Sequence, residues 1–237
     1  MSPLKIMIGH DSRQPLSANV LANSIYRRSS LPVSIAMLDI KTLPIKRQGL
    51  TEFTYSRYLV PWLCDYQGWG LFLDSDMLVM ADIAELFFCA DESKAVMVVK
   101  NAQRFEWPSL MLFNCAKCTS LTPKYVENYG SPQDFGWAQG AVGELPKEWN
   151  HCVGYDEPAP AKLAHYTQGI PLWFETSDCE YSKEWMDEMR EMEKICAWKD
   201  IMAASVHAKP VLQKMLLGYA QAQMDQQKAI QVKKEAA

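Results

Sequence analysis

The sequence of 237 residues has no excess of basic residues, no long apolar run and no regular cysteine pattern. Its formal net charge of −4 lacks the basic surface with which nucleic-acid-binding proteins displace counterions. No apolar run approaches the ~18 to 20 residues that cross a bilayer, and no apolar stretch of signal-peptide length follows Met1. We therefore expect a cytoplasmic protein with no nucleic-acid partner and no membrane contact.

The seven cysteines are an odd number and are spread through the chain, which favours reduced thiols over a disulfide framework. Cys115 and Cys118 form a C-x-x-C pair. No second such pair and no spaced pair of histidines accompanies them, as a zinc site would require. We interpret these two cysteines as structural thiols of the core.

The composition is that of a folded domain. Hydrophobic residues make up 49% of the chain and charged residues 22%, which is enough apolar material for a sizeable core and excludes a wholly disordered chain. A length of 237 residues fits one large domain, or one domain with an appendage. We find no internal repeat.

Short apolar runs alternate with helical patterns through the first half of the chain. Ala18, Leu21 and Ile25 recur at the spacing of a helix that packs on a sheet. A helix is also expected from Thr51, disturbed at Pro61, and another across residues 81–88. The predicted strands cover residues 5–9, 33–38, 70–74, 95–99, 110–114 and 162–166. This alternation predicts an α/β fold with a sheet at its centre.

The C-terminal quarter has a different pattern. Trp185, Met189, Met192 and Ile195 follow one another at helical spacing after Ser182. We therefore divide the chain into a main domain, residues 1–181, and a helical C-terminal extension, residues 182–237. The extension is expected to dock on the domain, bind an acceptor or pair two subunits into a homo-oligomer.

The strongest chemical signal is an apolar strand that runs into Asp74-Ser75-Asp76. In an extended chain the two carboxylates point the same way, because strand side chains alternate. At ~4 Å apart they repel by about 4 kcal/mol at an effective dielectric constant of ~20, so the pair favours a cation or a shared proton. Hard oxygen ligands favour Mg²⁺ or Mn²⁺. Two solvated acids at a strand end remain the alternative.

Two further polar residues lie in apolar surroundings. His165 ends the strand at residues 162–166, and an imidazole that joins two carboxylates favours Mn²⁺ over Mg²⁺. A core histidine satisfied by hydrogen bonds is the alternative. Arg57 must find an anion, either an internal carboxylate or a ligand phosphate, and the sequence does not choose between them.

The order of these motifs resembles glycosyltransferase family 8, which includes glycogenin and bacterial lipopolysaccharide sugar transferases. The resemblance extends over residues 4–174, and its spelling is that of a less characterised bacterial or phage-like branch. It rests on Gly9-His10-Asp11, Tyr55-x-Arg57-x-x-x-Pro61, Asp74-Ser75-Asp76, Phe113-Asn114, and His165 followed by Gly169 and Trp173. The resemblance implies a GT-A fold, which is a single Rossmann-like α/β domain, and a retaining transfer of a sugar from a nucleotide-sugar donor.

The resemblance also implies roles for individual residues. Asp74, Asp76 and His165 would hold Mn²⁺, or Mg²⁺, against the donor diphosphate. Gln139 would be the catalytic glutamine beneath the donor sugar, with a positioning role. The remaining residues would bind the donor. Asp11 and its neighbours Gly9 and His10, after the first strand, would face the nucleotide base, and Ser75 would face the ribose. Arg57 and Asn114 would face the diphosphate or the donor sugar, and Gly169 would also belong to the donor site.

Two departures from the family pattern concern charge. Ala138 and Gly140 flank Gln139 where the family has acids, and Pro171 occupies the position of a lysine that faces the diphosphate. The family resemblance thus implies a cation that this loop does not supply.

We predict a metal-dependent glycosyltransferase that uses a nucleotide-sugar donor, most simply a UDP-sugar, and a saccharide or other glycan acceptor. One alternative is a protein that binds a nucleotide sugar without turnover. The other is a phosphatase of the haloacid-dehalogenase type, which also carries D-x-D after a strand. The position of Asp74, deep in the chain, argues against that class.

Overall fold

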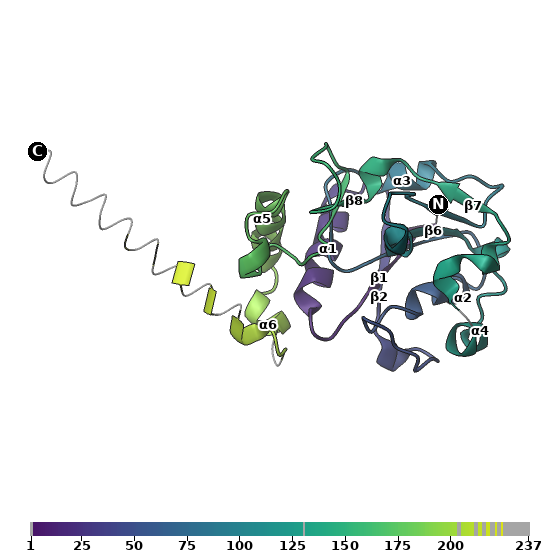
Figure 1. Ribbon diagram of the computed structural model, residues 1–237, viewed down its shortest axis with the longest axis horizontal. Helices are drawn as coiled ribbons and strands as arrows, with labels where there is room; N and C mark the ends of the chain where they lie inside the picture. The colour runs from purple at the N-terminus through teal and green to yellow at the C-terminus, as the bar shows by residue number, and fades with distance from the viewer. Residues whose placement is uncertain are drawn as a thin grey trace, which may run out of the picture.

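The molecule is built around a mixed six-stranded sheet (Figure 1). A computed structural model describes residues 2–129, 131–202, 205–210, 213–214, 217–218, 221 and 224. The strand order is β2-β1-β3-β6-β5-β7. Strands β1, β2 and β3 are parallel, β6 runs antiparallel to both of its neighbours, and β7 is parallel to β5. The strands are β1 Leu4–Gly9, β2 Val33–Leu38, β3 Trp69–Leu73, β5 Val96–Val98, β6 Leu110–Asn114 and β7 Val142–Glu144.

A small second sheet continues from the end of β3. Its order is β4-β9-β8, with β4 antiparallel and β8 parallel to β9. These strands are β4 Met77–Val79, β8 His151–Cys152 and β9 Leu163–His165. The helices are α1 Pro15–Arg28, α2 Val60–Leu63, α3 Ala84–Phe88, α4 Pro123–Asn128, α5 Ser182–Glu193 and α6 Trp198–Met202.

Both faces of the large sheet are covered by apolar side chains. Ile8 and Leu73 point to one face, where they pack against α1 through Ile25. Phe72 points to the other face and packs in a cluster with Tyr58, which precedes α2. A strand that is covered on both faces contains few polar side chains. The side chains that can bind a ligand or react are therefore found in the residues that follow the strand ends.

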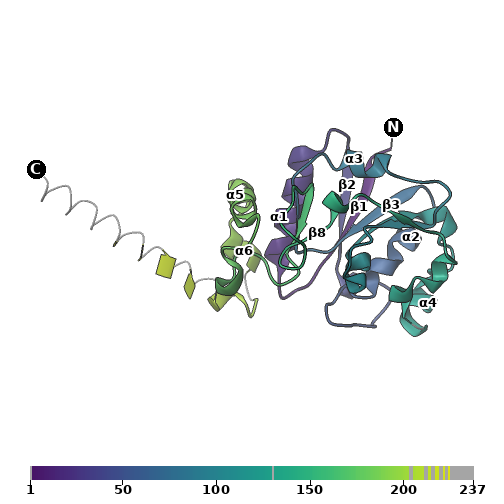
Figure 2. The ribbon, with the colours of Figure 1, turned by 45° about the horizontal axis from the view of Figure 1, so that its top comes forward.

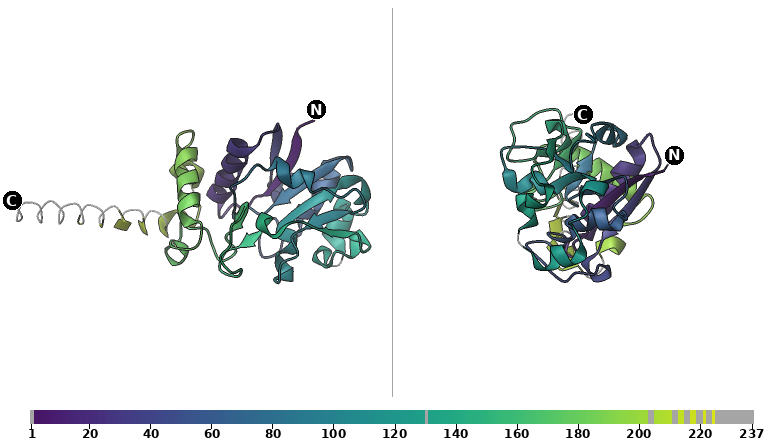
Figure 3. Two further views of the ribbon diagram at one scale, coloured as in Figure 1. Left: turned by 90° about the horizontal axis from the view of Figure 1, so that it is seen from above. Right: turned by 90° about the vertical axis from the view of Figure 1, so that its right-hand side faces the viewer.

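Helix α1 lies between the sheet and α5. Two of its buried side chains, Leu16 and Val20, belong to a separate cluster with Trp185 and Met189 of α5. Glu188 of α5 is 1% exposed and is bound by Arg27, Arg28 and Asn23 of α1. Two further views show α5 beside α1 on the side away from the large sheet (Figure 2, Figure 3).

The predicted α/β fold is confirmed, and strands lie within or close to each predicted range. Three short strands, β4, β7 and β8, carry no apolar run long enough to predict them. The helix expected from Thr51 is instead a turn and a 3₁₀ helix, Ser56–Leu59, and α2 then starts with Pro61 in its first turn, where a missing N–H costs little. Ile195 lies beyond the end of α5 and is 83% exposed, so it does not continue the buried stripe.

Three buried thiols lie beneath the sheet. Cys64, Cys115 and Cys118 are free cysteines of the cluster around Tyr58, and the Cys118 thiol donates to the Ala95 carbonyl. The division at residue 181 stays a prediction. Of the proposed extension, residues 225–237 lie outside the described part of the chain.

Candidate metal centre and nucleotide pocket

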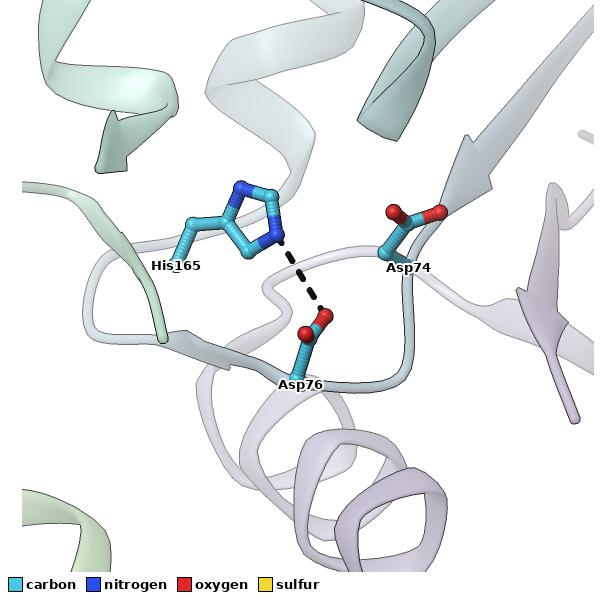
Figure 4. Close-up of side chains that lie close together, drawn as sticks. All are labelled: Asp74, Asp76 and His165. Atoms are coloured by element: carbon cyan, nitrogen blue, oxygen red, sulfur yellow. Dashed lines mark ion pairs between the residues drawn. The ribbon is translucent and has the colours of Figure 1, made fainter. Parts of the chain in front are cut away.

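Asp74, Asp76 and His165 converge at the end of β3. Each offers one ligand atom, and these three atoms lie within 4.8 Å of one another. The close-up shows the carboxylates of Asp74 and Asp76 and the imidazole turned toward a common space (Figure 4). It is the one such group of histidine, cysteine and acidic side chains found among the described residues.

The backbone explains why these side chains meet. Asp74 directly follows the buried strand β3, and its N–H donates to the Ser109 carbonyl at 2.9 Å. The chain turns and continues as β4, in which Met77 pairs with His165 of β9. The Asp76 carbonyl accepts from the N–H of Tyr166 at 2.9 Å. Two strand pairings therefore fix all three positions.

Burial and charge strongly perturb the site. Burial raises the pKa of Asp74 to about 7, against the opposing effect of Arg57, and the Asp76 charge raises it further. Burial by itself would lower the pKa of His165, but Asp76 raises it well above the usual range. Both shifts favour bound protons, which offset the negative charge of the site. Such perturbed groups cluster at functional sites.

Two carboxylate oxygens of the site lack a hydrogen bond. Asp74 Oδ1 and Asp76 Oδ1 are buried and have no hydrogen-bond partner among the described residues. Asp74 Oδ1 lies 3.2 Å from Arg57 Nη1, and Asp76 Oδ1 lies 3.4 Å from His165 Nε2, which is ion-pair distance without hydrogen-bond geometry. Buried acceptors of this kind are costly unless a ligand satisfies them. Two oxygens and one imidazole nitrogen fit a divalent cation.

The far nitrogen of His165 is held by residues that carry no sequence signal. His165 Nδ1 lies 3.0 Å from Asn150 Oδ1, and Asn150 Nδ2 donates to Ser109 Oγ at 2.9 Å. Glu106 Oε2 lies 3.9 Å from the same Nδ1, and burial raises the pKa of Glu106. Since an amide oxygen only accepts, Nδ1 carries a proton and Nε2 is turned toward the carboxylates.

Arg57 is an internal partner of the site. Its guanidinium lies near the rings of Phe53 and Phe72, at 5.4 and 5.1 Å from their centroids, and donates to the Pro108 carbonyl at 2.9 Å. Its carboxylate partner is Asp74. The anion that the sequence required is therefore present within the protein.

A pocket of about 300 Å³ opens beside the cluster. Three predicted residues line it: Asp11, Ser75 and Asp76. Arg13 is bound to Asp11 at 2.6 Å, and its hydrogen bonds hold the pKa of Asp11 below the usual value in spite of burial. The other lining residues are Gln14, Leu50, Thr51, Phe53 and His207. His207 lies outside the family resemblance, so the motifs did not indicate it.

Three further residues that were predicted to bind the donor, Gly9, His10 and Gly169, do not line this pocket. Gly9 lies against Phe53, whose ring carbon would be 2.5 Å from an added Cβ. Gly169 has φ of +123° and faces the Trp173 ring, so a side chain there would be both strained and crowded. His10 is half-buried after β1 and is not among the residues that line the pocket.

Two predicted residues lie away from the cluster. Asn114 pairs with Trp69 in the register of β6 and β3, whereas Leu73, next to Asp74, pairs with Leu110. Asn114 is thus at the opposite end of β3. Gln139 is exposed in the turn that leads into β7. Two residues later, the Ala141 carbonyl accepts from the N–H of Ala95, which precedes β5, so this turn lies at the same end of the sheet as Asn114. The structure does not bring either residue to Asp74.

Two further pockets are lined by residues around β8 and β9, and neither is lined by Asp74, Asp76 or His165. One, of about 450 Å³, is lined in part by Asn101, Asn150 and His151. The other, of about 370 Å³, shares Asp156 and Glu157 with it. No helix in the described part of the chain combines the length and the apolar character needed to cross a membrane.

Sequence comparison finds a relative in a plant. The chain is 34% identical to Protein CDI of Arabidopsis thaliana over 231 aligned residues, which cover 81% of this chain and 88% of the relative. The chain belongs to the Protein CDI family. No family model matches the sequence. Membership of glycosyltransferase family 8, and of a bacterial or phage-like branch of it, stays a prediction.

Solved structures establish the fold of this member of the CDI family. It is similar to the bifunctional glycosyltransferase WbbM (TM-score 0.60, 17% identity), covering 81% of this chain and 51% of that one. It is also similar to the glycosyltransferase GlyE of Streptococcus pneumoniae (0.59, 18%), covering 85% and 62%. The chain thus spans about half to three fifths of the length of these two proteins. The galactosyltransferase LgtC, in complex with donor and acceptor sugar analogues, gives 0.54 at 13% identity over 84% of this chain and all of that one. The predicted GT-A fold is confirmed.

Proposed function

We propose that this protein is a metal-dependent glycosyltransferase that transfers a sugar from a nucleotide-sugar donor to a hydroxyl group of a glycan. The observation that carries the proposal is the cluster of Asp74, Asp76 and His165 at the end of β3, which opens into a pocket on a GT-A fold. A UDP-sugar is the proposed donor, from the family resemblance.

The ligand set supports Mn²⁺, with Mg²⁺ as the second choice, because an imidazole nitrogen joins two carboxylates. A divalent cation bound there would neutralise the charge that develops on the departing nucleoside diphosphate. The chain prepares the site for it. Asn150 orients the imidazole of His165, and Arg57 offsets part of the charge of the buried Asp74.

We place the nucleoside in the pocket lined by Asp11 and Ser75, which follow β1 and β3. Ligands of open α/β sheets bind beyond the carboxyl ends of such strands. The acceptor then approaches from the opposite side of His165, through the pocket lined by Asn101, Asn150 and His151. Its amide and imidazole groups suit the hydroxyl groups of a saccharide.

Retention of configuration is proposed from the family resemblance. With Gln139 at the far edge of the sheet, no covalent step on this residue is required. The acceptor hydroxyl instead attacks on the face that the leaving diphosphate vacates, and a phosphate oxygen accepts its proton. The contribution of the protein is to hold donor and acceptor together in this geometry.

A second candidate is binding of a nucleotide sugar without transfer. It is favoured by the departures at Pro171 and beside Gln139, which remove charges that the family pattern places near the donor. The metal cluster and the pocket serve this function equally well.

Calorimetric titration with UDP, GDP and CMP, each with and without Mn²⁺, tests the shared part of both candidates. We expect UDP to bind only with Mn²⁺. No binding of any nucleotide under either condition would overturn both candidates. Hydrolysis of UDP-sugars, or transfer to added saccharides, then separates the enzyme from the binding protein.

A further inference from the structure

One wall of the nucleotide pocket comes from a part of the chain far from the motifs. His207 lines the pocket together with Asp11, Ser75 and Asp76. Its ring lies against Trp173, with 5.4 Å between the ring centroids and 58° between the planes. Trp173 in turn lies beside the Gly169 turn that follows His165. The C-terminal region therefore reaches both the pocket, through His207, and the loop that follows His165.

Hydrogen bonds anchor this region to the pocket loops. Ser205 Oγ donates to the Arg13 carbonyl at 2.8 Å and accepts from the N–H of His207 at 3.3 Å. Met202 and Ala208 pack in the cluster that contains Trp173. These contacts hold the backbone on both sides of His207 to the domain, which is what a preformed ligand contact requires.

The loop after Gly169 is fixed by a lysine from the same region. Lys214 Nζ donates to the carbonyls of Pro171, Leu172 and Trp173, at 3.3, 2.9 and 2.7 Å. An ammonium group has three hydrogens to donate, and these three carbonyls occupy them. Lys214 thus positions the loop in which Pro171 stands, and does not itself offer a free cation to the pocket.

The basic side chains that line the pocket differ in their partners. Arg13 is bound to the carboxylate of Asp11. His207 lines the pocket and has no acidic partner within the described residues, and an imidazole ring carries at least one N–H that can donate to a ligand. A nucleoside diphosphate brings negative charge next to Asp76, and a hydrogen-bond donor in the same pocket can bind its oxygens.

We propose that His207 is a binding residue for the nucleoside diphosphate, donating a hydrogen bond to one of its oxygens from a wall that Ser205 and Lys214 hold in place. This inference rests on the proposed function, because it takes the pocket beside Asp76 as the nucleotide site. It assigns to Ser205, His207 and Lys214 a part in ligand binding that lies outside the family resemblance.

The test compares His207→Ala, His207→Gln and Lys209→Ala by calorimetric titration with UDP at saturating Mn²⁺. Loss of one hydrogen bond to a charged ligand predicts about tenfold weaker UDP binding in His207→Ala. His207→Gln keeps an N–H donor and is expected to recover most of the affinity. Lys209 is exposed on the same segment, so its loss is expected to change nothing. Mn²⁺ affinity without nucleotide should be equal in all four proteins.

Histidine footprinting of the unmodified protein gives a second measurement that needs no variant. The chain has four histidines, of which His151 lines a different pocket. We expect UDP with Mn²⁺ to protect His207 from acylation, whereas His151, whose side chain is 5% exposed and bonded to Glu180, should stay unlabelled with and without UDP. Wild-type UDP affinity in His207→Ala, or unchanged labelling of His207, would overturn this inference alone. Failure of the wild-type protein to bind UDP would overturn the proposed function with it.

Discussion

The two ends of strand β3 carry polar residues in opposite states. At one end Asn114 Nδ2 lies 3.3 Å from Glu92 Oε2, and the Trp69 indole donates to Glu92 Oε1 at 3.1 Å. At the other end Asp74 and Asp76 each keep a buried oxygen without a hydrogen bond. Both ends belong to the same strand of the same sheet, and both carry polar or acidic side chains.

The difference between the ends is whether the protein satisfies its own polar groups. A polar group paired within the chain stabilises the fold and leaves nothing for a ligand. A buried acceptor without a partner raises the free energy of the empty site and favours whatever completes it. Under the proposed function, the end of β3 at Asp74 is the end that binds a ligand, and changes there and at Asn114 should have unequal effects.

The largest effect is expected from Asp76→Asn. It removes one ligand charge, and we expect at least about a hundredfold loss of Mn²⁺ affinity, because ligand charge sets the affinity of such sites. The Asp76 side chain is 30% exposed, so thermal unfolding should change little. Calorimetric titration with Mn²⁺ measures the loss.

The matched control is Glu92→Gln, which makes the same change at the other end of the strand. Glu92 bonds to Asn114 and Trp69, so its loss should leave Mn²⁺ affinity unaltered. Full Mn²⁺ binding by Asp76→Asn, or an equal loss in both variants, would contradict the assignment of the metal site.

The next effect is a dependence of Mn²⁺ affinity on pH. The pKa of Asp74 is raised to about 7 and that of His165 is also raised, so both groups hold protons at low pH that a metal must displace. Each displaced proton makes the affinity rise by about tenfold per pH unit, so the rise should be steepest below pH ~7, where both groups are protonated. In the metal-free protein the sign is reversed. Groups with raised folded-state pKa values contribute stability at low pH that is lost as pH rises.

Titrations with Mn²⁺ in two buffers of different ionisation enthalpy measure the released protons directly. Thermal unfolding with and without Mn²⁺ at pH 6 and pH 8 measures the opposed trends in stability. Mn²⁺ affinity that does not change with pH would mean that Asp74 and His165 are not the ligands.

A smaller effect is expected from Asn150→Ala. Asn150 accepts from Nδ1 of His165, and removal of such an outer partner commonly costs tenfold in metal affinity. Asn128→Ala is the matched control, since Asn128 is exposed and donates only to the Lys124 carbonyl. Equal Mn²⁺ affinity in Asn150→Ala and the wild-type protein would show that the imidazole needs no support.

The strands and the metal cluster were accessible from the sequence for a physical reason. Runs such as Leu71-Phe72-Leu73 are buried on both faces, so their burial shows in composition alone. Asp74 and Asp76 follow such a run directly, and the β4–β9 pairing then brings His165 to them. Local pattern was sufficient for the two acids because they are two residues apart in the chain, whereas His165 was assigned to them by the family resemblance.

The supporting residues were not accessible in this way. Glu106, Asn150 and His207 reach the site through turns and short elements whose residues carry no periodic pattern. The strands β7 and β8, which carry the chain past the site, are three and two residues long. Register also matters. The sequence predicts correctly that Phe113-Asn114 ends a strand. Because β6 runs antiparallel to β3, however, this strand end lies at the end of the sheet away from Asp74.

The smallest effect is expected where the family resemblance and the register disagree. Gln139 is exposed in a left-handed conformation, with φ of 49°, on the way to β7 at the far edge of the sheet. Gln139→Ala should therefore leave UDP affinity with Mn²⁺ within about twofold, the size of effect that surface changes away from a site produce. Asn114→Ala should do the same for binding but cost about 1 kcal/mol of stability, because it leaves Glu92 with one partner fewer. A tenfold loss of UDP affinity in Gln139→Ala alone would mean that this turn moves to the metal when the donor binds. The comparison of the two ends would then hold only for the ligand-free protein.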